Sequence, residues 1–144
     1  MLARVLAATV AGGITYFLLG FLIWGLFLED AMKPNMNVYP GLMNDVPVWA
    51  PLIIANLVTA FLFAYILDNW AQVRTFAAGA KAGAIIAFLQ ALSFQLMFLA
   101  FMNLHKNYMP PVVDVLVSTV MGAITGGVIG LVLGMMNKGN AARE

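Results

Sequence analysis

Four apolar stretches dominate this sequence, and each is long enough to cross a lipid bilayer. They cover about residues 5–28, 48–67, 76–102 and 112–136, whereas a membrane-spanning helix requires roughly 20 residues. Helices are expected because a backbone in lipid must satisfy its own hydrogen bonds, and the two-residue alternation of a β-barrel is absent. The sequence therefore predicts an all-α integral membrane protein, a four-helix bundle in one transmembrane domain over residues 1–144.

The composition argues against an ordinary soluble domain. Hydrophobic residues make up 63% of the 144 residues and charged residues only 9%, whereas soluble domains are about 25% charged. The net charge of +1 provides no basic surface for nucleic acid. The expected partner is the lipid bilayer, and no nucleic-acid partner is expected.

Side chains that carry out catalysis are sparse. His105 is the only histidine, there is no cysteine, and neither Ser93 nor Ser118 lies in a G-x-S-x-G sequence. No H-E-x-x-H motif is present, and a metal site built from His105 and the acids near it has no supporting spacing. We therefore expect no enzymatic activity, no catalytic residue, no metal and no cofactor.

Lysine and arginine are distributed unevenly between the two ends of the predicted bundle. The end with both termini carries Arg4, Arg74, Lys81, Lys138 and Arg143, and the other end carries Lys33 and Lys106. Positive residues accumulate on the cytoplasmic side of membrane proteins. We therefore expect a multi-pass membrane protein with both termini in the cytoplasm. The family resemblance described below implies that this membrane is a bacterial inner membrane.

The long connection over residues 29–47 is then an outer loop. Its prolines interrupt any helix. Tyr39, and Trp49 just after the loop, are typical of the aromatic belt at a membrane surface, which predicts a loop lying on that surface. A lid over an outward-facing cavity is the alternative.

The starts of the first and third spans align without a gap. Seven of 25 positions agree between the segments that begin at Arg4 and Arg74, and Gly13 matches Gly83. Because each repeat unit would hold two spans, both units have the same orientation. The alignment predicts two helical hairpins related by an axis along the membrane normal.

Small residues recur every four positions on two of the spans. In lipid, helices associate by close packing, and small residues allow their backbones to approach. The fourth span offers Gly122, Gly126, Gly130 and Gly134, and the third offers Gly79, Gly83, Ala87 and Ala91. The antiparallel register that we expect pairs Gly79 with Gly134, Gly83 with Gly130, Ala87 with Gly126, Ala91 with Gly122, and Gln95 with Ser118. An alternative is that the glycine face forms a homo-oligomer interface.

Polar residues gather in the outer half of the spans. The candidate ligand-binding residues are Asn56, Gln90, Gln95, Asp114 and Ser118. They form either a small outward-facing pocket or hydrogen bonds that tie helices together. Asp114 follows two prolines and suits the start of a helix, and it is also the candidate acid of an outward-facing site.

One charged pair is expected at the opposite end. Lys81 lies about two turns inside the third span, a depth from which lysine extends its ammonium group to the interface. Asp68 follows the second span and is the expected partner of Lys81.

Three segments resemble a family of small bacterial four-span membrane proteins, the family of unknown function numbered 1761. They are GGITYFLLGFLIWGLFLEDAMK in the first span, KAGAIIAFLQALSF in the third and VDVLVSTVMGAITGGVIGLVLG in the fourth. The resemblance implies a compact four-helix membrane protein. It implies no established activity, cofactor or site residue.

Two functions are consistent with these features. A non-enzymatic scaffold or accessory subunit, in a homo-oligomer or a larger membrane complex, is favoured because the spans offer packing surfaces without an embedded charge relay. The alternative is a small transporter or binder of a hydrophobic or lipid-like ligand, which the outer polar residues and the long loop favour.

Overall fold

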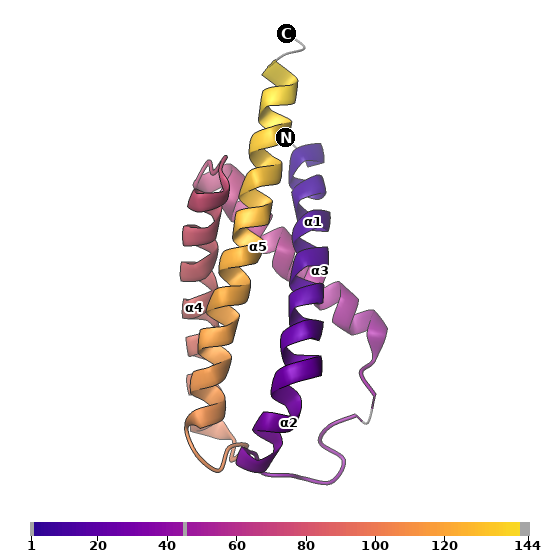
Figure 1. Cartoon of the computed structure of the whole chain (residues 1–144), viewed down its shortest axis with the longest axis vertical. Coiled ribbons are helices and arrows are strands. Elements are labelled where there is room, and N and C mark those ends of the chain that lie inside the picture. Colours follow the sequence, from indigo (N-terminus) through magenta and orange to yellow (C-terminus); the bar gives the residue numbers. More distant parts are fainter. Residues whose placement is uncertain (1, 45, 142–144) are drawn as a thin grey trace.

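The structure is a computed structural model that describes residues 2–44 and 46–141, and side chains up to residue 137. The long helices are α1 (Leu2–Gly20), α3 (Trp49–Tyr65), α4 (Phe76–Phe101) and α5 (Met109–Ala141). The short segments are the π-helical η1 (Phe21–Leu28) and η3 (Ile66–Trp70), α2 (Glu29–Met32) and the 3₁₀ turn η2 (Lys33–Asn35). The helices pack together as an all-α bundle (Figure 1), which confirms the predicted fold class.

Four helices in the described part of the chain are long and apolar enough to cross a membrane. These candidate spans are Leu2–Asn35, Trp49–Trp70, Phe76–Phe101 and Met109–Asn137. Within Phe76–Phe101, only 6% of the most apolar 18-residue segment is buried inside the protein. Such an exposed apolar surface requires lipid around it, so the chain is a multi-pass membrane protein.

The first span is longer than the sequence predicts. α1 continues without a break through η1 and α2, as Figure 1 shows. All residues of η1, FLIWGLFL, are apolar and none is buried. The sequence predicts an end at residue 28 because two acidic residues follow. In the structure, Glu29 and Asp30 instead occupy the first turn of α2, where carboxylates are compatible with the helix dipole.

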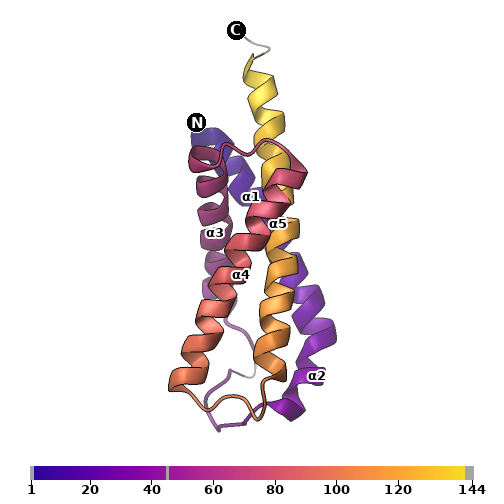
Figure 2. The same cartoon turned by 90° about the vertical axis from the view of Figure 1, so that its left-hand side faces the viewer.

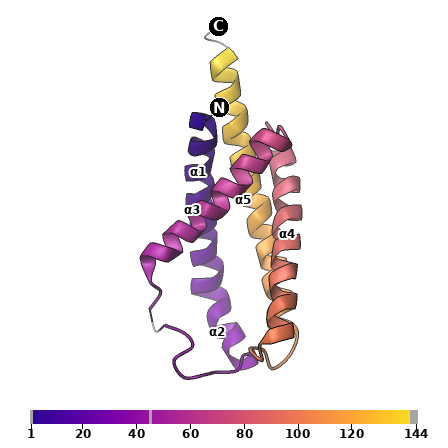
Figure 3. The same cartoon turned by 180° about the vertical axis from the view of Figure 1, so that it is seen from behind.

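α3 crosses the other helices obliquely, so that only its C-terminal end comes near the start of α4 (Figure 3). The chain reverses there through a tight connection in which Gln72 has a left-handed backbone (φ 48°). The Val73 amide donates to the Leu67 carbonyl at 2.8 Å. Thr75 then caps α4 by accepting a hydrogen bond from the Ala78 amide, as expected for an N-cap threonine.

α4 and α5 pack through their small residues, side by side in Figure 2. A Cβ atom built at Gly83 would lie 2.9 Å from the Gly126 Cα, and one built at Gly126 would lie 2.8 Å from the Gly83 Cα. These separations are shorter than van der Waals contact, so the two backbones touch. The glycine face of α5 is therefore buried within the chain and is not free to form a homo-oligomer interface.

The predicted register of α4 against α5 is wrong by one step of the glycine repeat. Gly126 faces Gly83, Gly122 faces Ala87, Gly130 faces Gly79, and Gly134 packs on the backbone of Arg74. Gly122, Gly126 and Gly130 thus each meet a residue four positions earlier in α4 than expected, and Gly134 lies beyond the start of α4. A repeat of equal steps allows either register, and the polar groups at the two ends of the interface distinguish them.

α1 packs between α3 and α5. Gly12 faces Ile129 of α5, and Gly13 faces Leu57 of α3. Gly13 and its repeat counterpart Gly83 therefore each face the second helix of their own hairpin. α1 and α4 also run in the same direction through the bundle (Figure 1), which is the parallel arrangement that the alignment predicts.

Candidate functional site

A cavity of about 320 Å³ lies where the four long helices meet. Each helix contributes at least one polar side chain to its lining. The lining residues are Tyr16 from α1, Thr59 and Phe63 from α3, Ala87, Gln90, Ala91, Phe94, Gln95 and Phe98 from α4, and Asp114 and Ser118 from α5. The lining thus combines polar side chains with the aromatic rings of Phe63, Phe94 and Phe98.

The carboxylate of Asp114 is the charged group of this lining. Pro110 and Pro111 start α5 and suit the first turn of a helix, where a missing backbone N–H costs nothing. This start places Asp114 against α4, where Gln95 Nε2 donates to Asp114 Oδ2 at 2.7 Å. The sequence predicts Ser118 as the partner of Gln95, and that prediction is wrong because the register is shifted by one step.

The hydrogen bond to Asp114 fixes the orientation of the Gln95 amide. Its NH₂ group points to Asp114 Oδ2, which leaves the carbonyl oxygen as the remaining acceptor of the amide. Gln95 Oε1 is then buried and accepts no hydrogen bond from the described part of the chain. A buried acceptor without a donor costs about 1–3 kcal/mol, so a donor that reached this atom would be stabilised by it.

The structure brings together four of the five candidate ligand-binding residues. Gln90, Gln95, Asp114 and Ser118 all line the cavity. Asn56 does not, because its amide donates to the Leu52 carbonyl of its own helix at 2.6 Å.

Sequence reasoning missed two polar residues of the cavity, Tyr16 and Thr59. Tyr16 follows Thr9, Gly12 and Gly13 at helical spacing, and those three residues are buried. A search for polar groups on the small-residue face of the first span would have found Tyr16.

The long loop packs against the connection between α4 and α5. Asn37 N donates to the Leu104 carbonyl, and Lys106 N donates to the Asn35 carbonyl, each at 2.9 Å. The Tyr39 hydroxyl donates to the Asn103 carbonyl at 2.6 Å. All residues that line the cavity belong to the four long helices. The described part of this loop therefore links the end of the bundle opposite the termini without lining the cavity.

His105 lies apart from Asp114. It lines a separate hollow of about 270 Å³, formed by Leu99 of α4 and by residues of the connection between α4 and α5. The sequence places His105 near the polar cluster, but the structure directs it to this hollow because Met36 pairs with it across the two loops.

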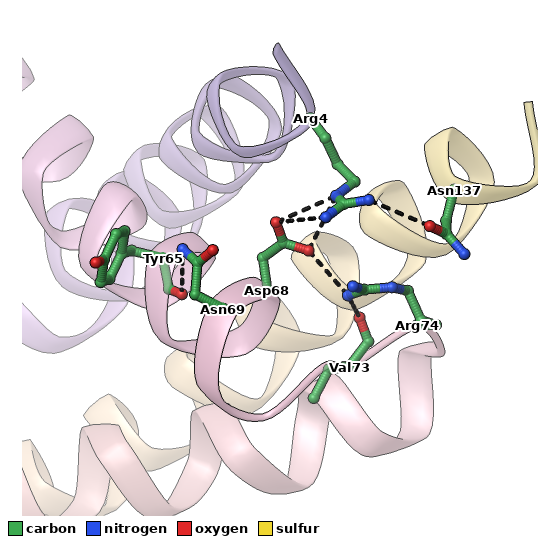
Figure 4. Close-up of polar contacts among 7 residues, drawn as sticks. All are labelled: Arg4, Tyr65, Asp68, Asn69, Val73, Arg74 and Asn137. Carbon is green, nitrogen blue, oxygen red and sulfur yellow. Dashed lines mark hydrogen bonds and ion pairs between the residues drawn. The ribbon is translucent and has the colours of Figure 1, made fainter. Parts of the chain in front are cut away.

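At the opposite end, two arginines bind one buried carboxylate (Figure 4). The Asp68 side chain has no exposed surface, and Arg4 and Arg74 each approach its Oδ1 atom to 3.0 Å. Arg4 also donates to Asn137 Oδ1 on α5 at 3.2 Å. The predicted pair of Asp68 with Lys81 is wrong, because the tight turn after η3 brings Arg74 to the carboxylate and the start of α1 brings Arg4.

No family model, curated protein or solved structure matches this chain. The resemblance to the four-span family numbered 1761 therefore stays a prediction.

Proposed function

We propose that this protein binds a small amphipathic molecule in the cavity between its four helices. The single observation that supports the proposal is the cavity itself, whose lining holds both the Gln95–Asp114 pair and aromatic side chains within an apolar bundle. Binding sites for small molecules are typically concave, mostly apolar and provided with a few convergent polar groups. Polar groups inside a membrane bundle also mark substrate pathways by default.

The arrangement of the helices supports entry of the ligand from the bilayer. α3 packs along α1, and α4 packs along α5, so α3 and α4 do not form a pair with each other. Residues of both α3 and α4 line the cavity. A lipid-like molecule would reach the polar groups between these two helices without crossing the outer loops.

The scaffold hypothesis has less support than the binding hypothesis. It is favoured by packing surfaces without an embedded charge relay, but the glycine face, which offered one route to a homo-oligomer, is occupied by the packing of α4 on α5. We propose a binding or carrier activity without covalent chemistry, in a chain of the four-span type that the family resemblance implies.

We also propose that both termini face the cytoplasm. Arg4, Arg74 and Lys81 lie at the end of the bundle with the N-terminus, while Lys33 and Lys106 lie at the other end. Arg143 and the side chain of Lys138, which the sequence argument also uses, lie outside the described residues. The excess of positive charge at the terminal end supports an inner-membrane protein in this orientation.

A cavity-filling substitution tests the proposed function. Thr59→Phe introduces a ring into the lining from α3, and Val58→Phe is the matched control because Val58 is 61% exposed on the outer surface. Native mass spectrometry of gently extracted protein should detect a bound small molecule on the wild type and on Val58→Phe. The molecule should be lost from Thr59→Phe.

Two outcomes would contradict the proposal. One is a bound molecule that remains on Thr59→Phe at the wild-type level, since the ligand would then lie elsewhere. The other is a ligand-free oligomer, or a complex with a second protein, which would favour the scaffold hypothesis.

A further inference from the structure

The lining of the cavity has an unbalanced charge. Asp114 is its acidic residue, and none of the described lining residues is lysine, arginine or histidine. A carboxylate within a membrane bundle is costly unless a cation or a proton accompanies it.

The described cations of the chain are engaged or positioned elsewhere. Arg4 and Arg74 bind Asp68 at the opposite end of the bundle. Lys33 binds Glu29 and Asp30 beyond η1. Lys106 donates to the Pro34 carbonyl in the outer loops, and Lys81 is exposed near the start of α4. Asp114 therefore receives one neutral hydrogen bond, from Gln95, and no salt bridge from the described residues.

The polar groups around Asp114 favour a ligand that donates hydrogen bonds. Gln95 Nε2 is used by Asp114, and Gln95 Oε1 is a buried acceptor without a donor. The hydroxyl groups of Tyr16 and Ser118, which also line the cavity, can accept as well as donate. A ligand with an N–H group and a positive charge would satisfy both Asp114 and Gln95.

The aromatic residues of the lining suit an apolar body next to such a cation. Phe63 is buried, and Phe94 and Phe98 stack with their ring centroids 6.5 Å apart. Aromatic faces attract cations as well as apolar groups, and this attraction is stronger where water is excluded. The rings therefore fit both parts of an amphipathic cation.

We infer that the ligand is an amphipathic amine in its ammonium form, with Asp114 as its counter-ion and Gln95 Oε1 as a second acceptor. This inference depends on the proposed function, because it assigns the ligand class of the same cavity. The charge of Asp114, the unpaired acceptor Gln95 Oε1 and the aromatic rings together favour this ligand over a neutral or anionic lipid.

Three compounds with the same alkyl chain test the inference. Decylammonium, decanol and decanoate are titrated calorimetrically into the full-length protein in neutral phosphatidylcholine nanodiscs, with empty nanodiscs as the partition blank. Wild-type protein should bind decylammonium at least tenfold more tightly than it binds decanol or decanoate.

Asp114→Asn removes the charge and keeps an oxygen that accepts from Gln95. This variant should bind decylammonium at least tenfold more weakly than wild type does. Asp30→Asn is the matched control, since its carboxylate is 94% exposed and outside the cavity, and it should bind like wild type. Equal thermal unfolding of the two variants verifies that Asp114→Asn is folded.

Three results would overturn the inference. If Asp114→Asn binds decylammonium like wild type, Asp114 is not the counter-ion. If decanol or decanoate binds wild-type protein as tightly as decylammonium does, and Thr59→Phe no longer binds it, the cavity binds ligands but does not select cations. If none of the three compounds binds, and purified protein carries no other ligand, the proposed function fails together with the inference.

Discussion

Two buried threonines differ in whether their hydroxyl group makes a hydrogen bond. Thr9 is 7% exposed, and its Oγ1 donates to the Val5 carbonyl one turn earlier at 2.8 Å. Thr125 has no exposed surface, and its Oγ1 has no hydrogen-bond partner in the described part of the chain. The two residues are similar in burial and helical setting, so they form a natural comparison.

Thr125→Val should raise the free energy of unfolding by up to about 1 kcal/mol, because it removes an unsatisfied buried group while keeping the shape of the side chain. Thr9→Val should lower it by about 0.5–1 kcal/mol, because it removes a hydrogen bond that is made. Unfolding in mixed micelles with an increasing fraction of dodecyl sulfate measures the free energy of unfolding of both variants. Destabilisation by Thr125→Val would mean that the hydroxyl has a partner in the membrane.

At the scale of the helices, the α4–α5 interface is a contact between two backbones. All of the glycines proposed for helix packing, Gly79, Gly83, Gly122, Gly126, Gly130 and Gly134, are buried. The atoms nearest a Cβ built at Gly126 belong to the backbone of Gly79 and Gly83. A backbone cannot move aside as the end of a flexible side chain can, so this interface tolerates little change.

Gly126→Leu should therefore separate α4 from α5 and lower the free energy of unfolding by about 3 kcal/mol or more, at the upper end of the range for overpacked cores. Gly25→Leu is the control, because a Cβ atom there meets only the Phe21 ring at an ordinary 3.5 Å. Thermal melting in detergent compares the two variants. Equal melting temperatures would show that the glycine face is not packed in the membrane.

Across the whole molecule, polar contacts close both ends of the bundle. At one end, Asp68 joins the start of α1, the end of η3 and the connection to α4, and Arg4 extends the cluster to Asn137 on α5 (Figure 4). At the other end, the outer loops bind each other through backbone hydrogen bonds. The cavity lies between these two sets of polar contacts.

Asp68→Asn should destabilise the protein by about 2 kcal/mol. Removing one partner of a buried ion pair costs about 3–5 kcal/mol, but Arg4 and Arg74 are 17% and 28% exposed, so water or lipid phosphate would partly solvate them. Asp30→Asn should cost less than about 1 kcal/mol, since its pair with Lys33 is exposed. Unfolding in mixed micelles measures the destabilisation of both variants. If Asp68→Asn and Asp30→Asn lose similar free energies of unfolding, Asp68 does not have the structural role that we assign to it.

The candidate site was partly predictable from the sequence. Gln90, Gln95, Asp114 and Ser118 stand out because polar groups are rare inside apolar spans, and that signal is local. Tyr16 and Thr59 do not stand out, since tyrosine and threonine are common in such helices. Their place in the cavity depends on how α1 and α3 face the other two helices.

The sequence by itself determined the four spans, the all-α class and the pairing of the two small-residue faces. Hydrophobic length and side-chain size are properties of each segment, so they can be read without knowing its neighbours. Only the tertiary structure decided the register of α4 on α5, because a four-residue repeat pairs glycine with small residues at every step. It also decided that Asp68 binds Arg4, 64 residues away in sequence, and that the cavity exists, since both depend on how helices remote in sequence cross.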